Sequence, residues 1–117
     1  MNLDSFREHC LAKPDVTEEF PFGEDTLVFK VNGKMFALTN IEEFDRINLK
    51  CDPELAVELR EQFPAVLPGY HMNKKHWNTV VMNGSISDKL IKSWIDNSYN
   101  LVFWKVSSSP EKSKKRN

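Results

Sequence analysis

Residues that can do chemistry are concentrated in one short stretch, PGYHMNKKHWNTVVMNG, which runs from Pro68 to Gly84. It contains two histidines, two lysines, a tyrosine and a tryptophan. These side chains can ligate a metal, neutralise a phosphate or stack against a base. The same stretch also suits a β-hairpin with a polar turn at 73–75. It is therefore either a binding site or a structural hairpin with a polar surface.

The two histidines of this stretch, His71 and His76, are candidate metal ligands. The other soft ligands of the chain are His9, Cys10 and Cys51. A zinc site needs three or four ligands at spacings such as C-x2-C, and the chain has no such spacing. A three-residue turn at 73–75 puts the two imidazoles on opposite faces of the hairpin, whereas a four-residue turn at 72–75 brings them face to face. We expect hydrogen-bonded histidines, and neither a metal nor another cofactor.

Nucleophilic catalysis has one candidate, Cys51, which precedes a predicted helix N-terminus where a thiolate is favoured. Cys51 also continues the apolar alternation of Ile47 and Leu49, so we expect it in the core. The four glycines lie scattered at turns and form no phosphate loop. The acidic pairs Glu18-Glu19 and Glu42-Glu43 resemble solvated loop charge more than a general acid and base. The sequence therefore predicts a protein that is not an enzyme.

Nucleic-acid binding is the remaining chemistry. Lysines flank both predicted hairpin tips, with Lys74 and Lys75 at one tip and Lys30 and Lys34 at the other. Two such tips can act as wings along phosphates, with Tyr70 or Trp77 against a sugar or base. Lysines at hairpin tips also serve simply to keep a protein soluble, and Trp77 alternates with Thr79 and Val81 as a core residue does. Both interpretations stay open at this point.

The charge distribution limits any polyanion site to one half of the chain. The 117 residues carry a formal net charge of −1, and 40% are hydrophobic and 28% charged, as in an ordinary globular domain. Residues 1–60 hold 7 Lys/Arg and 13 Asp/Glu, a balance of −6, and residues 61–117 hold 9 and 4, a balance of +5. Strong non-specific DNA binders have a basic excess. A binding site must therefore be local, unless the two halves simply attract each other.

The sequence gives no sign of membrane insertion or secretion. No apolar run approaches the roughly 18–20 residues that span a bilayer. The first residues, MNLDSFREHCLAKPD, lack the apolar core of a signal peptide. Cys10 and Cys51 then suit a reducing compartment as free thiols, with a disulfide between them as the alternative. We expect a cytoplasmic protein without membrane contact.

The clearest local structural signal is TLVFKVNGKMFALTN, where two alternating runs flank Asn32-Gly33. This dipeptide is typical of a type I′ hairpin turn, which needs positive φ at both positions. On the second strand we expect Met35 and Ala37 on one face, and Phe36 and Leu38 on the other.

Similar signals place the other elements. Pro14 ends an amphipathic helix, Asp52 and Pro53 cap and begin a second, and Ser85 or Ser87 caps a third. The predicted order is a helix over 2–13, an irregular acidic connection over 15–25, the hairpin over 26–40, a strand over 46–51, a helix over 53–63, strands over 70–72 and 76–82, and a helix from 88.

The order α-β-β-β-α-β-β-α predicts an α+β fold, with an antiparallel sheet of about five strands and helices packed on one face. Residues 1–106 then form a single domain. The last residues, 107–117, read SSSPEKSKKRN and contain no apolar residue, so we expect a disordered basic tail.

Four segments together resemble the MmcQ/YjbR family of small bacterial proteins. They are FPFGEDTLVFKVNGKMFA, INLKCDPELAVELR, GYHMNKKHWNTV and LIKSWIDNSYNLV, and the resemblance runs from about Leu3 to Val102. It implies a CyaY-like α+β fold and DNA binding through a double-wing arrangement. The implied site residues are Asn73, Lys74, Lys75, His76 and Trp77, with Lys30 and Lys34.

Three functions follow as hypotheses. The first is a monomeric module that binds DNA weakly, because its near-neutral charge allows few phosphate contacts. The second is a protein-interaction module that uses an exposed sheet face or the acidic loop 15–25. The third follows from the CyaY-like resemblance and is a hard-cation site formed by Asp4, Glu8, Glu18 and Glu19.

Overall fold

The computed structural model describes residues 1–107. The tail predicted over 107–117 lies outside the described residues except for Ser107, which is the last residue of a helix. Within them the chain forms three helices and six strands. In order these are α1 (Leu3–Leu11), β1 (Val16–Glu19), β2 (Thr26–Val31), β3 (Lys34–Asn40), β4 (Arg46–Lys50), α2 (Pro53–Gln62), β5 (Val66–Pro68), β6 (Trp77–Val81) and α3 (Asp88–Ser107).

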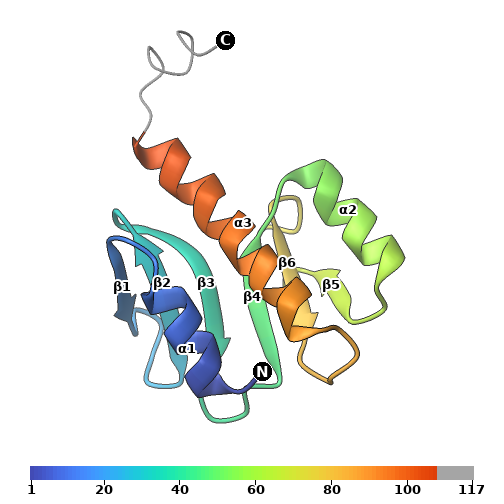
Figure 1. The fold of residues 1–117 in the computed structure, drawn as a ribbon, viewed down its shortest axis with the longest axis horizontal. Coiled ribbons are helices and arrows are strands. Elements are labelled where there is room, and N and C mark those ends of the chain that lie inside the picture. The colour runs from blue at the N-terminus through green and yellow to red at the C-terminus, as the bar shows by residue number, and fades with distance from the viewer. Residues whose placement is uncertain (108–117) are drawn as a thin grey trace, which may run out of the picture.

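The strands form one antiparallel sheet in the order β1-β2-β3-β4-β6-β5. In Figure 1, α3 crosses in front of the sheet, α1 lies beside it over the β1–β3 side, and α2 stands at the β5–β6 side. The predicted α+β architecture is confirmed, with one strand more than the expected five. The extra strand, β1, lies in the segment that was expected to be irregular. Its alternating side chains are mostly polar, because it forms an edge of the sheet.

The main core lies between the sheet and the helices. Aromatic rings run through it, with centroids 5.5 Å apart for Phe6 and Phe29 and 5.4 Å apart for Phe36 and Tyr99. Cys51 is buried in the same cluster, as the alternation of its strand predicts. Within the described residues none of the helices combines the length and apolarity that crossing a bilayer needs.

A bulge in the β2–β3 hairpin corrects the predicted facing of β3. Phe29 pairs with Ala37 but Lys30 pairs with Met35, so Phe36 is an extra residue in its strand. The extra residue places Phe36 and Ala37 together in the main core and Met35 with Leu38 on the other face. The prediction from strict alternation, with Met35 beside Ala37 and Phe36 beside Leu38, is therefore wrong.

The helix-free face of the sheet has a small core of its own. Val28, Leu38 and Trp77 are buried together there, and Met35 and Met72 pack against them. Met72 belongs to the segment between β5 and β6, so this segment covers part of the face that no helix covers.

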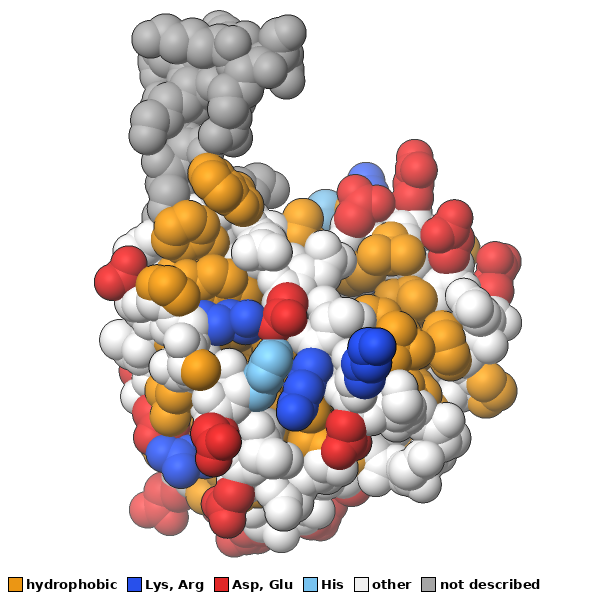
Figure 2. All heavy atoms as spheres, in the orientation of Figure 1, with side chains coloured by type: hydrophobic (Ala, Val, Ile, Leu, Met, Phe, Trp, Pro, Cys, Tyr) orange, Lys and Arg blue, Asp and Glu red, His pale blue; other side chains and the backbone are white. Residues whose placement is uncertain are grey.

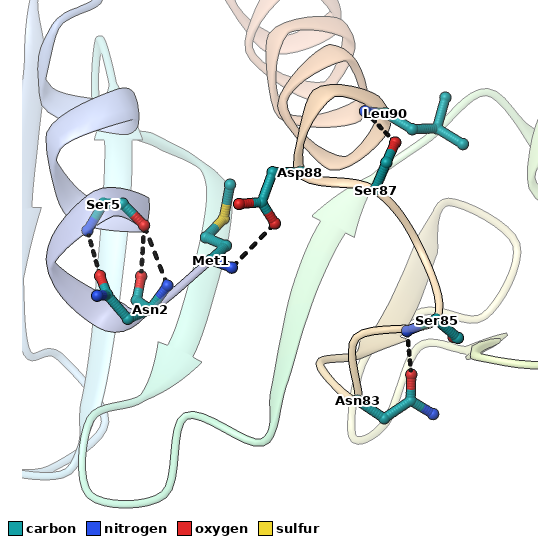
Figure 3. A network of polar contacts seen from close by, with 8 residues as sticks. All are labelled: Met1, Asn2, Ser5, Asn83, Ser85, Ser87, Asp88 and Leu90. Atoms are coloured by element: carbon teal, nitrogen blue, oxygen red, sulfur yellow. Dashed lines mark hydrogen bonds and ion pairs between the residues drawn. The ribbon is translucent and has the colours of Figure 1, made fainter.

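Capping interactions fix where α1 and α3 begin (Figure 3). Asn2 and Ser5 form a reciprocal capping box at the start of α1. Ser87 caps α3, which decides between the two predicted serines. The amino group of Met1 lies 2.9 Å from Asp88 Oδ1, so the first turns of the two helices are linked.

The structure corrects the predicted hairpin over 70–82. The strand before β6 is β5, Val66–Pro68, and residues 69–76 form a loop, here called the 69–76 loop. Pro68 has no N–H to donate, but β5 lies at the edge of the sheet, where a proline is tolerated. Residues 73–75 are therefore one part of a longer loop and not a tight hairpin turn.

Candidate functional site

The 69–76 loop leaves β5 by passing very close to β6. A Cβ at Gly69 would lie 2.8 Å from Trp77 Cβ and 2.9 Å from Trp77 O, so only glycine fits there. Gly69 N donates to Trp77 O at 2.9 Å, and Tyr70 N donates to Thr79 Oγ1 at 2.8 Å. The next residue, His71, has φ of 57°, in the left-handed region. These constraints turn the loop back over the helix-free face.

The second half of the loop is fixed by side chains. Asn73 Oδ1 accepts hydrogen bonds from the N–H groups of Lys75, at 2.9 Å, and His76, at 3.2 Å. The ammonium group of Lys74 donates to Gly69 O at 2.8 Å. The loop is therefore a shaped element rather than a loose connection.

Arg60 of α2 reaches across to hold the base of the loop. Its Nε donates to Asn78 Oδ1 at 2.7 Å, and its Nη2 donates to the carbonyl oxygens of Lys74 and, at 3.3 Å, Trp77. The sequence did not predict this role, because Arg60 lies outside the loop and looks like a basic residue that stabilises the last turn of its own helix.

The structure separates the residues predicted for the first tip. Lys74 and Lys75 are exposed, and among the described residues neither forms an ion pair. Asn73 shapes the loop, and His76 is half-buried. Trp77 is only 7% exposed and packs with Val28 and Leu38, as the core interpretation expects. Tyr70, at 54% exposed, is accessible, and so is the neighbouring His71.

The second tip is formed as the sequence predicts. Asn32 and Gly33 have φ of 52° and 81°, which suits a type I′ turn. Lys34 is exposed beside this turn, whereas Lys30 Nζ lies 3.1 Å from Glu19 Oε1. The hydrogen bond from Lys30 is the main reason that the pKa of Glu19 is lowered.

Strand directions place both tips at the same end of the sheet. β2 and β4 run in one direction and β6 runs opposite to them, so the β2–β3 turn and the 69–76 loop share an end. The centres of the two hairpins are three strand positions apart, which corresponds to roughly 14 Å. This separation lets both tips lie along one surface.

A pocket of about 580 Å³ opens on the helix-free face beside the first half of the loop. Its walls include the aromatic residues Phe22, Tyr70 and His71, and its charged and amide residues are Asn40, Glu43, Asp45, Arg46 and Asn48. These residues come from the 15–25 connection, the end of β3, the β3–β4 turn, β4 and the 69–76 loop. The sequence singled out Tyr70 and His71, but it gave no sign that the loop folds back to meet the start of β4.

Short-range contacts order the pocket. The guanidinium carbon of Arg46 lies 5.1 Å from the centre of the Tyr70 ring, and Arg46 Nη2 lies 3.7 Å from Asp45 Oδ2. Asn48 Oδ1 accepts from the hydroxyl of Thr79, the same hydroxyl that accepts from Tyr70 N. The Asn48 amide NH2 group has no hydrogen-bond acceptor among residues 1–107.

The described residues give little support to metal binding or to nucleophilic catalysis. It contains no group of three or more His, Cys, Asp or Glu residues that could hold a metal ion. Both cysteines are free and buried, and burial raises the pKa of Cys51 to about 11. His9 Nε2 lies 2.7 Å from Asp96 Oδ1, so this histidine has a partner on α3.

The opposite, helical face does not offer a comparable site. Figure 2 shows this face, where Lys, Arg and His side chains gather near the centre with acidic side chains beside them. Asp96 alone pairs with both His9 and Lys13. The exposed lysines of the 69–76 loop and the pocket next to them are therefore the candidate site.

Together these features define a class of protein, a small α+β domain whose sheet is covered by helices on one face and partly by a loop on the other. The family model described as YjbR matches residues 11–101, and the chain belongs to the YjbR family. The family establishes the fold and leaves the ligand to be inferred from the site.

Two relatives match most of the chain or nearly all of it. The protein YjbR of Escherichia coli K12 is 34% identical over 116 residues, 98% of this chain and 96% of its own length. YbdF of Escherichia coli O157:H7 is 42% identical over 94 residues, which cover 80% of this chain and 77% of YbdF.

Two solved structures share the fold. The DUF419-domain protein DR2400 of Deinococcus radiodurans superposes with a TM-score of 0.86 at 40% identity, covering 97% of this chain and 86% of that one. A Pseudomonas syringae protein gives a TM-score of 0.74 at 35% identity, covering 87% of this chain and 99% of its own.

Proposed function

We propose that the protein is a DNA-binding module that acts without catalysis and contacts phosphates through the 69–76 loop. The observation that supports this most is that Lys74 and Lys75 are exposed and form no ion pair among the described residues. They lie on a loop whose shape is fixed by Asn73, by Arg60 and by the hydrogen bond from the Lys74 ammonium group to Gly69 O. A fixed cationic loop loses little conformational entropy when it binds. The burial of both thiols supports a role without covalent chemistry, and free thiols suit the cytoplasm.

The binding is weak and salt-sensitive. The net charge is −1, and at the second tip Lys30 is paired with Glu19, which leaves Lys34 as the accessible lysine there. Few phosphates are therefore neutralised, and each neutralised phosphate contributes about 0.9 to the slope of log affinity against log salt concentration.

Fluorescence anisotropy with a labelled duplex, measured across a series of low salt concentrations, tests the proposal. The double variant Lys74→Ala/Lys75→Ala should weaken binding to every duplex sequence and reduce the salt slope by about one per lysine. The matched control is Lys89→Ala/Lys92→Ala, which removes two exposed lysines from α3 and should leave the slope unchanged. Equal losses in both double variants, or no binding by the parent protein, would refute the loop as the site.

A second candidate, a protein-interaction module, is favoured by one observation. Phe20 and Phe22 in the acidic connection are 47% and 62% exposed, which is unusual for phenylalanine. An NMR titration with a duplex separates the two functions. DNA binding shifts the amide signals of residues 73–77 at low salt, and an interaction module leaves them unmoved.

A further inference from the structure

The pocket beside the loop has features that phosphate binding does not use. Tyr70 and His71 of the 69–76 loop line the pocket, and the ammonium group of Lys74 lies 2.8 Å from Gly69 O, next to Tyr70. A single ligand that lies along the loop can therefore contact both the lysines and the aromatic-walled pocket.

The charges of the pocket select against a phosphate inside it. Glu43 and Asp45 contribute two carboxylates, and Arg46 contributes one guanidinium that already lies near Asp45. A dianionic group would meet like charge there. A neutral group that carries several N–H donors is the better match, because carboxylate oxygens only accept hydrogen bonds.

The walls of the pocket suit a flat ring. Tyr70 is 54% exposed and Phe22 is 62% exposed, so ring surface of both stays accessible although Tyr70 also contacts His71 and Arg46. Aromatic side chains that accept unstacked bases are the common device of proteins that bind single strands. The pocket volume of about 580 Å³ is typical of small-ligand sites.

Two of the four described non-glycine residues with positive φ lie at the pocket. His71 and Phe44 have φ of 57° and 43°, and both positions adjoin residues that line the pocket. Residues other than glycine keep such conformations only where surrounding contacts enforce them, and such residues cluster at ligand sites.

We propose that this pocket holds one unstacked nucleobase of a single-stranded nucleic acid. Tyr70 and Phe22 lie against the base, and Lys74 and Lys75 hold neighbouring phosphates. The inference rests on the proposed function and deepens it by naming the form of nucleic acid.

The hydrogen-bonding groups of the pocket favour guanine. Its Watson–Crick edge offers adjacent N–H donors at N1 and N2, which the carboxylates of Glu43 and Asp45 can accept. Its O6 is an acceptor for the unpaired NH2 group of Asn48. Thymine presents one donor between two acceptors and fits this arrangement less well.

The test compares three labelled probes at low salt, namely a nine-thymine strand, the same strand with one central guanine, and a nine-base-pair duplex. The guanine-containing strand should bind about tenfold more tightly than the thymine strand, because only guanine makes the hydrogen bonds described above, and more tightly than the duplex. Tyr70→Ala removes the ring that holds the base against those hydrogen-bonding groups, so it should reduce this preference while keeping the salt slope. Phe22→Ala should also reduce the preference for guanine. Because Phe22 is largely exposed, this variant should fold normally, so its effect cannot be attributed to misfolding. Leu67→Ala, an exposed apolar change outside the pocket lining, is the control.

The outcomes distinguish this inference from the function on which it rests. Lysine-dependent binding with no guanine preference, or with a preference that neither aromatic variant alters, overturns the base pocket and leaves DNA binding in place. If no strand or duplex binds, guanosine alone is titrated by NMR. The absence of any strand or duplex binding has by then refuted the proposed function. Shifts at residues 70–72 support the base pocket by itself, and their absence overturns the base pocket as well.

Discussion

At the scale of single residues, Gly69 determines whether the candidate site exists. It lies where β5 ends, and its missing side chain lets the 69–76 loop pass against the backbone of Trp77. Met72 Cβ is also only 3.1 Å from the position that a Cβ would take. The conformation of the loop, and with it the pocket, thus depends on residue 69 having no Cβ.

Gly69→Ala should therefore destabilise the protein and disturb the site. The added methyl group overpacks a contact with backbone, which cannot rotate away, and we expect a loss of about 1–3 kcal/mol of unfolding free energy. Urea unfolding measures the loss, and amide shifts report the loop. Gly33→Ala is the comparison, because it has open space but φ of 81°, and it should leave the signals of residues 69–76 in place. An unchanged loop in Gly69→Ala would contradict the steric argument.

At the scale of elements, α1 and α3 are joined by polar contacts on the helical face. Asp96 of α3 pairs with His9, and also with Lys13 just after α1. Partial burial acts to raise the pKa of Asp96, but the hydrogen bonds from Lys13 and His9 outweigh it, and the pKa lies below its usual value. The ionised carboxylate therefore stabilises the docking of the two helices.

Asp96→Asn should lower stability at pH 7 by less than about 1 kcal/mol, because the carboxylate is partly exposed and screened by solvent. A depressed folded pKa means that the contribution is complete above the unfolded pKa and disappears as the pH falls through the folded pKa. Urea unfolding at pH 7 and at a series of acid pH values should thus show the difference between the two proteins starting to shrink near pH 3.8, the ordinary value of the carboxyl, and vanishing only below the lowered folded pKa. Glu24→Gln, an exposed loop change, is the control. A difference that persists in acid would mean that the asparagine itself disrupts packing.

At the scale of the whole molecule, one sheet carries two cores. The main core lies under the helices, and Val28, Leu38 and Trp77 form the smaller one on the opposite face. Strands β2, β3 and β6 contribute to both, so neither core can melt while the other keeps its strands. The fold should therefore unfold as a single cooperative unit.

Leu38→Ala tests this coupling. It should cost about 2–4 kcal/mol, as expected for truncating a buried leucine, while Leu67→Ala, at an exposed position, should cost little. A background with Trp94→Phe and Trp104→Phe leaves Trp77 as the fluorescent reporter of the small core. Its unfolding midpoint should coincide with that of far-UV circular dichroism. Separate midpoints would show that the small core melts on its own.

Several features were predictable from the sequence because their causes are local. Asn32-Gly33 specifies its turn through the φ angles that the two residues tolerate, and Asp52 with Pro53 specifies the start of α2 through capping. The exposure of Lys74 and Lys75 belongs to the same group, because charged side chains beside a polar loop rarely find burial. In each case the deciding interactions lie within a few residues.

The features that the tertiary structure decided depend on partners distant in sequence. The polar segment of β1 becomes a strand because β2 offers it an edge, and β5 forms despite Pro68 because β6 lies beside it. The pocket needs the 69–76 loop, the β3–β4 turn and the 15–25 connection to converge, and the support of the loop by Arg60 crosses from another element. Local propensity carries no information about such pairings, since their energy arises only when the sheet brings the segments together.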